Sequence, residues 1–169
     1  MAAGKILSVI AGIITLFATY VLSWVSVTVP PTFYAYGIGL IKNLPAMFTQ
    51  ADALGVLLGV PGFVLYIIAG IGIVFLLSGI FQLLGVKSRT FALIGSIFVL
   101  LMGIMLLLGT LNIIINIDWV IYIFGDSVPL IEGRVPFDLV LGPASLGLYV
   151  LIAGGVIGLI AGIMGPEDF

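Results

Sequence analysis

The side chains that could do chemistry in this chain are few, and their densest group is Asn112, Asn116 and Asp118. Amide and carboxylate oxygens are the ligands that a hard cation prefers. The same side chains also cap helices and lie at interfaces between polar and apolar surroundings. We favour capping and interface roles for this group, and cation binding remains the alternative.

Asp126, Glu132 and Asp138 follow at irregular spacing, which predicts a solvated rim rather than a paired acid–base site. The chain has no Cys and no His, so sites and catalytic systems built on these residues are excluded. Its glycines lie within long apolar segments and form no phosphate-binding loop. We therefore predict no enzyme activity, no cofactor and no metal. The net charge of −2 offers no basic surface for nucleic acid.

The elements that position these residues are long apolar segments. Of the 169 residues, 63% are hydrophobic and only 7% are charged, and the mean hydropathy is +1.45. These values are typical of a chain that exposes its surface to lipid. The sequence predicts an all-α membrane protein, a single domain over residues 1–169 built as a bundle of four transmembrane helices. The predicted spans are Lys5–Val27, Pro61–Leu84, Thr90–Asn112 and Pro143–Gly165.

The basic residues set the expected orientation. Lys5, Lys87 and Arg89 lie beside span ends, whereas Lys42 and Arg134 lie within two long connections, residues 28–60 and 113–142. By the positive-inside rule, both termini are expected on the cytoplasmic side of the plasma membrane, and the two connections are outer loops.

A weak internal repeat relates the two halves. A shift of 83 residues aligns Gly59 with Gly142 and Gly72 with Gly155, which allows the bundle to be two repeated helical hairpins. The alternative is that glycine-rich apolar helices resemble each other through composition alone.

Small residues at spacing four predict close helix packing. Gly154, Gly158 and Gly162 form one such stripe. In the first span the stripe is Ala11, Thr15, Thr19 and Ser23. Such stripes let helix backbones approach closely in a membrane. We expect them to close the bundle, and an outward-facing groove for a partner helix or a lipid is the alternative.

The outer loops are unusually apolar. Their aromatic residues allow two interpretations: an interfacial belt, or a cap that another protein covers. We favour the second. The residues expected at this surface are Trp24, Tyr34, Tyr36, Trp119, Tyr122 and Phe124. The run Trp119–Ile131 combines β-prone residues with a Gly-Asp turn, which predicts a small β-hairpin.

Four spans with a β-prone first outer loop that bears Trp24 resemble the claudin arrangement. The resemblance is architectural, because the Gly-Leu-Trp motif and the paired cysteines of that family are missing. It implies a tetraspan adhesion or barrier protein that self-associates.

We weigh three functions. The first is a small non-catalytic accessory subunit of a larger membrane complex, with other membrane subunits and lipids as its partners. The second is the claudin-like protein. The third is a passive channel formed by several copies and lined by Thr15, Thr19 and Ser23.

Overall fold

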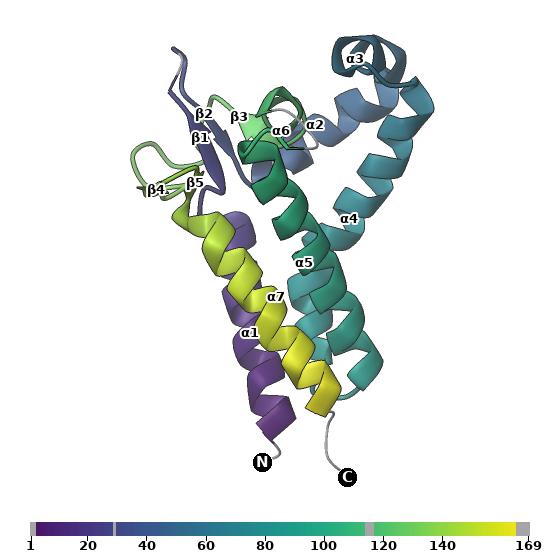
Figure 1. Cartoon of the computed structure of the whole chain (residues 1–169), viewed down its shortest axis with the longest axis vertical. Helices are drawn as coiled ribbons and strands as arrows, with labels where there is room; N and C mark the ends of the chain where they lie inside the picture. The colour runs from purple at the N-terminus through teal and green to yellow at the C-terminus, as the bar shows by residue number, and fades with distance from the viewer. Residues whose placement is uncertain (1–2, 29, 114–116, 165–169) are drawn as a thin grey trace.

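The computed structural model describes residues 3–28, 30–113 and 117–164, and it shows a long helical bundle with a mixed cap at one end (Figure 1). The helices are α1 (Ala3–Tyr20), α2 (Gly37–Thr49), α3 (Ala51–Leu58), α4 (Gly62–Leu84), α5 (Arg89–Thr110), α6 (Ile117–Phe124) and α7 (Leu146–Met164). The strands are β1 (Val25–Val27), β2 (Phe33–Ala35), β3 (Gly125–Asp126), β4 (Val140–Leu141) and β5 (Ala144–Ser145).

The bundle consists of α1, α4, α5 and α7, each long and apolar enough to cross a membrane. This confirms the four long apolar helices that the sequence predicts. The helices form a ring in which α1 and α5 each pack between α4 and α7. Glycines allow the close approach: Gly79 lies against Leu16 and Gly162 against Leu93, where an added Cβ would come within 2.6 Å of the leucine.

The cap is built jointly by both outer loops. Strand β2 lies between β1 and β3 in one antiparallel sheet, with Val25 opposite Ala35 and Tyr34 opposite Asp126. Strands β4 and β5 form a separate antiparallel pair. The first outer loop also contains α2 and α3, and α4 leans outward toward them (Figure 1). The cap therefore holds more regular structure than the sequence predicts.

Two predicted span limits are wrong. Helix α1 ends at Tyr20 rather than Val27, because the chain turns into β1 and the Trp24 amide donates to the Ala35 carbonyl at 2.9 Å. Helix α7 begins at Leu146 rather than Pro143. Residues 142 and 143 instead form the two-residue turn between β4 and β5, and Gly142 supplies the φ of +70° there.

The predicted hairpin over Trp119–Ile131 is also wrong. Residues up to Phe124 form helix α6, and only the next two residues form a strand. Val120, Ile123 and Phe124 are buried along one face of α6. Their spacing of three and four is the helical period, and it outweighs the β propensity of the individual side chains. Small antiparallel pairs do exist in the outer loops, at β1–β2 and β4–β5.

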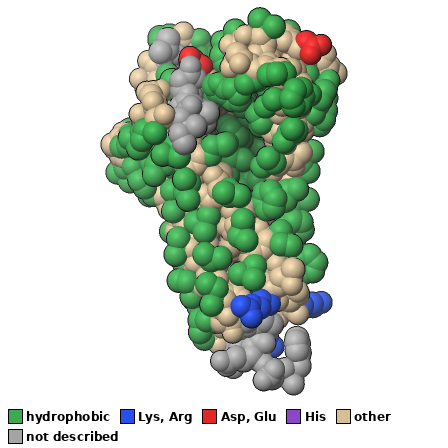
Figure 2. Space-filling model, turned by 45° about the vertical axis from the view of Figure 1, so that its right-hand side comes forward, with side chains coloured by type: hydrophobic (Ala, Val, Ile, Leu, Met, Phe, Trp, Pro, Cys, Tyr) green, Lys and Arg blue, Asp and Glu red, His purple; other side chains and the backbone are tan. Residues whose placement is uncertain are grey.

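Charge is divided between the two ends of the molecule. Lys5, Lys87 and Arg89 lie near the end of the bundle that holds both termini, and acidic side chains appear at the cap (Figure 2). The proposed duplication remains a prediction. Its two hairpins do pack as pairs, α1 with α4 and α5 with α7, but the two outer loops fold differently.

Candidate functional site: the cap and the polar centre of the bundle

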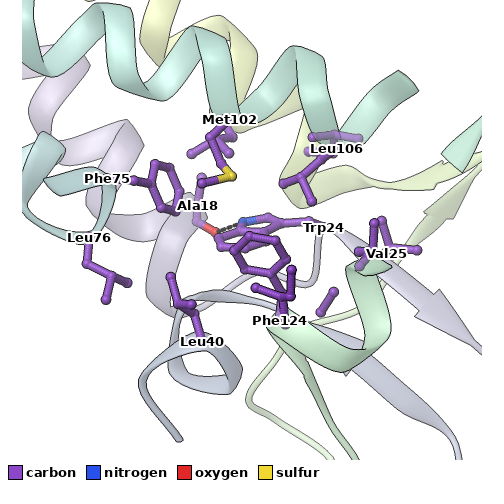
Figure 3. Close-up of a cluster of buried hydrophobic side chains, with 14 of the residues drawn as sticks. Ala18, Trp24, Val25, Leu40, Phe75, Leu76, Met102, Leu106 and Phe124 are labelled. Atoms are coloured by element: carbon purple, nitrogen blue, oxygen red, sulfur yellow. Dashed lines mark hydrogen bonds between the residues drawn. The ribbon is translucent and has the colours of Figure 1, made fainter. Parts of the chain in front are cut away.

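Trp24 lies at the centre of the packing between cap and bundle. Its side chain is 0% exposed, and its indole N–H donates to the Ala18 carbonyl at 2.8 Å. The ring meets Phe75 and Phe124 edge-on, with centroids 5.5 and 5.8 Å away (Figure 3). Because the last carbonyls of a helix lack helical partners, this bond satisfies the end of α1 where it is buried. Trp24 thus joins α1 and α4 to α6 of the second loop.

Polar contacts join the two outer loops at α2 and α6. Lys42 on α2 forms an ion pair with Asp126 on β3. Beside it, the Asn43 amide donates to the carbonyls of Ile123 at 3.2 Å and Gly125 at 3.0 Å. The hydrogen bond with Asp126 holds the pKa of Lys42 above its usual value. These contacts satisfy the carboxyl end of α6 and fix it against α2.

The same junction is also closely packed. Gly39 lies against the Phe124 carbonyl so tightly that no Cβ could be accommodated without movement. Tyr36, at the start of α2, is fully buried, and its amide donates to the same carbonyl at 3.2 Å. Burial raises the pKa of Tyr36, and the charge of Asp126 raises it further. The first and second outer loops therefore form one packed unit.

The structure divides the six predicted interface residues into two groups. Trp24, Tyr36 and Phe124 are buried within the chain itself, so their surface is already covered without a partner. Tyr34 and Trp119 are half-buried, and Tyr122 is exposed. The expectation that apolar outer loops need a partner to cover them therefore does not hold for the first three residues.

Other apolar side chains of the cap remain exposed. On α3, Val56 is 85% exposed and Leu57 is 56% exposed. A second exposed group lies on and before β4, and it consists of Phe137, Leu139, Val140 and Leu141. Hydrophobic side chains cover much of the cap in the face shown by Figure 2. Of the six residues named for the partner surface from the sequence, Tyr122 alone is exposed, and most of the exposed apolar side chains of the cap lie elsewhere.

The two small-residue stripes are buried within the chain, but Ser23 lies beyond the end of α1 and is not part of the helix stripe. All seven positions predicted for helix packing are buried. The Gly154 position of α7 faces Thr15 of α1, where an added Cβ would come within 2.7 Å of the Thr15 hydroxyl. Gly158 faces Ser96 of α5 and Gln82 of α4. The stripes face neighbouring helices of the same chain rather than an outward groove.

Gln82 is a buried polar residue near the end of α4, and it is not among the residues that the sequence predicts for helix packing. Its side chain is 0% exposed, and its Nε2 donates to the Ser96 hydroxyl at 3.2 Å, which in turn donates to the Ala92 carbonyl at 2.6 Å. Ser8 of α1 donates to the Gln82 backbone carbonyl at 2.7 Å. Within the described residues, Gln82 Oε1 has no hydrogen-bond partner. A polar centre thus connects α1, α4 and α5 beside Gly158 of α7.

Within residues 3–28, 30–113 and 117–164, no three acidic side chains gather closely enough to hold a metal ion. Asn112 adopts a φ of +53° just beyond the end of α5, in keeping with a terminating residue. Asn116 lies outside the described residues, so the alternative of a cation site there stays a prediction.

Comparison with known proteins gives no assignment: no family model, curated protein or solved structure matches this chain.

Proposed function

We propose that this chain is a small, non-catalytic accessory subunit of a larger membrane complex. In this proposal α1, α4, α5 and α7 cross the plasma membrane, both termini are cytoplasmic, and the cap lies outside. The exposed sides of the four helices support embedding, because they carry large apolar residues such as Ile13, Ile67 and Leu101. Lys5, Lys87 and Arg89, all at the end opposite the cap, support the orientation.

The observation that carries the subunit proposal is the apolar surface of α3. Val56 and Leu57 protrude from a helix that lies beyond the outer end of α4, at the tip of the cap (Figure 1). Burying an exposed valine or leucine side chain stabilises an assembly by about 1.5–3 kcal/mol per residue. Two such adjacent side chains therefore favour a protein partner over exposure to water.

Substitution on α3 tests the proposal. Leu57→Gln should reduce the amount of partner protein that co-purifies with the chain from its native membrane in mild detergent. The matched control is Val128→Gln, which makes a similar change at an exposed apolar residue outside α3 and should leave the complex intact. A wild-type chain that purifies as a lone, monodisperse monomer would contradict the proposal. So would equal recovery of partners with both variants.

Claudin-like self-association is the second candidate, and β4 favours it. Val140 and Leu141 are both exposed, and they form one side of a sheet of two strands. Such an edge can pair with another chain. Val140→Lys should then abolish homo-oligomers in reconstituted membranes, whereas Leu57→Gln should not. Deletion of Trp119–Ile131 would not test self-association by itself, because it would also remove buried residues of α6.

The passive channel has less support. Thr15, Thr19 and Ser23 are at most 1% exposed in the single chain, since they pack within it. They would have to leave this packing to line a pore between copies. The channel remains testable as flux through liposomes, and unchanged flux with Thr19→Leu would exclude this lining.

A further inference from the structure

A small apolar pocket opens on the flank of the bundle beneath α6. Its volume is about 90 Å³, and residues of α4, α5 and α6 line it. The outer part of α4 leans toward α2 and α3 (Figure 1). Ile71 of α4, Met105 of α5 and Trp119 of α6 are among the residues that line the pocket, and the surface that the lining presents is wholly apolar. Nothing in this lining favours water or a polar ligand.

The mouth of the pocket belongs to the outer surface of the bundle. Ile71 and Met105 are exposed, and their helices carry further exposed apolar residues at Ile67 and Leu101. The pocket is therefore continuous with the flank that we propose to face lipid. A hydrocarbon chain that enters the pocket therefore moves from the apolar lipid to an apolar protein surface.

Polarity changes across Trp119. On one side this residue lines the apolar pocket, and on the other it lines a mostly polar recess together with Asp118 and Tyr122. Tryptophan and tyrosine favour the level of the lipid headgroups in membranes. The pocket then lies directly below that level, at the depth of the upper acyl chain. This change from polar to apolar matches a phospholipid, whose glycerol region borders its acyl chains.

Size restricts the occupant further. A cavity of about 150 Å³ binds a single benzene ring in an engineered protein. The smaller volume here admits a segment of a single alkyl chain and is too small to enclose a fused ring system. We propose that the pocket holds the upper part of one acyl chain of a membrane phospholipid, whose glycerol region lies beside Trp119. This inference rests on the proposed membrane embedding, but not on the presence of a protein partner.

The two tryptophans of the chain provide the assay. The protein is reconstituted into phosphatidylcholine vesicles whose acyl chains carry bromine close to the glycerol backbone, because bromine quenches tryptophan fluorescence on contact. Trp119→Phe measures the background quenching, because the remaining tryptophan, Trp24, is fully buried. Leu111→Trp, added to the Trp119→Phe protein, reports ordinary lipid contact at an exposed position at the outer end of α5.

The pocket predicts stronger quenching of Trp119 than of the Leu111→Trp reporter. Filling the pocket with Ile71→Phe should remove this excess. The matched control Ile73→Phe, at an exposed position of the same helix that does not line the pocket, should retain it. Quenching of Trp119 that does not exceed the reporter, or that is unchanged by Ile71→Phe, overturns the pocket proposal. Absence of quenching at both tryptophans overturns the membrane embedding as well, so the two failures are distinguishable.

Discussion

Trp24 provides the sharpest test of the fold, because it separates a core residue from a residue of an interfacial belt. A belt tryptophan keeps one side in contact with lipid headgroups and tolerates replacement by another aromatic residue. In the structure Trp24 is 0% exposed instead, and it lies between Phe75 and Phe124. The perturbation is Trp24→Phe, and Trp119→Phe is the control at the half-buried second tryptophan.

The expected magnitude follows from the two interactions that the change removes. Loss of the indole N–H leaves the buried Ala18 carbonyl without this partner, which costs about 1–3 kcal/mol. The smaller ring leaves a void that costs about 1 kcal/mol more. Trp24→Phe should therefore lower the free energy of unfolding by about 2–4 kcal/mol, and Trp119→Phe by about 1 kcal/mol or less.

Unfolding in mild detergent, followed by far-ultraviolet circular dichroism during titration with a denaturing detergent, measures both values without relying on tryptophan emission. If both variants lost the same small free energy of unfolding, Trp24 would not be part of the core. The burial of the cap against the bundle would then be wrong.

Two further predictions concern packing and pH. Gly158→Ala should destabilise the bundle by about 1–3 kcal/mol, because the added Cβ would collide with Ser96. The control is Gly70→Ala on α4, where nothing lies within 4 Å of the added Cβ. In the same unfolding assay, this control should be neutral or slightly stabilising. The raised pKa values of Lys42 and Tyr36 mean that the folded state keeps these protons to higher pH than the unfolded state does. The stability they contribute is present at neutral pH and should be lost as pH rises above about 10, through the folded-state values. The free energy of unfolding, measured at increasing pH above about 10, should fall, and Lys42→Met should make this fall smaller. A free energy of unfolding that rises with pH in this range would contradict the raised pKa values of Lys42 and Tyr36.

The four long helices could be predicted from sequence because their signal is strong and local. More than twenty mostly apolar residues without Asp, Glu, Lys or Arg leave few alternatives, and backbone groups in lipid must bond within their own segment. The span limits were less accurate for the same reason. Residues 21–27 are as apolar as α1, and only the pairing of Val25 with Ala35 shows that they leave the helix. That pairing depends on a residue ten positions away, which hydropathy does not report.

Helix α6 shows why the cap was harder to predict. Its isoleucines, valine and aromatic residues favour a strand by propensity, yet they also have the spacing of a helix with one buried face. In a short apolar run the two periods cannot be told apart without knowing what the segment packs against. The core around Trp24 supplies that surface, and its other walls come from α1, α4 and α5.

Gln82 shows a related limit of sequence reasoning. It lies two residues before the end of α4, and polar residues at span ends commonly meet the interface. Its distance from the end of the bundle matters less than the face of α4 that it occupies, because this face points to Ser96 and Gly158. A glycine stripe on one helix opposite a lone polar residue on another was the available signal, and it required knowing which helices are neighbours.

Burial of the cap also changes what must be explained. Trp24, Tyr36 and Phe124 are among the residues expected at a partner surface, but the chain covers them itself. In the subunit proposal, a partner therefore recognises exposed surfaces such as α3 and the segment around β4. These surfaces lie on different sides of the cap (Figure 1). Because a symmetric pair of copies needs only one self-complementary patch, two separate patches favour attachment to different neighbours, as a subunit within a larger complex requires.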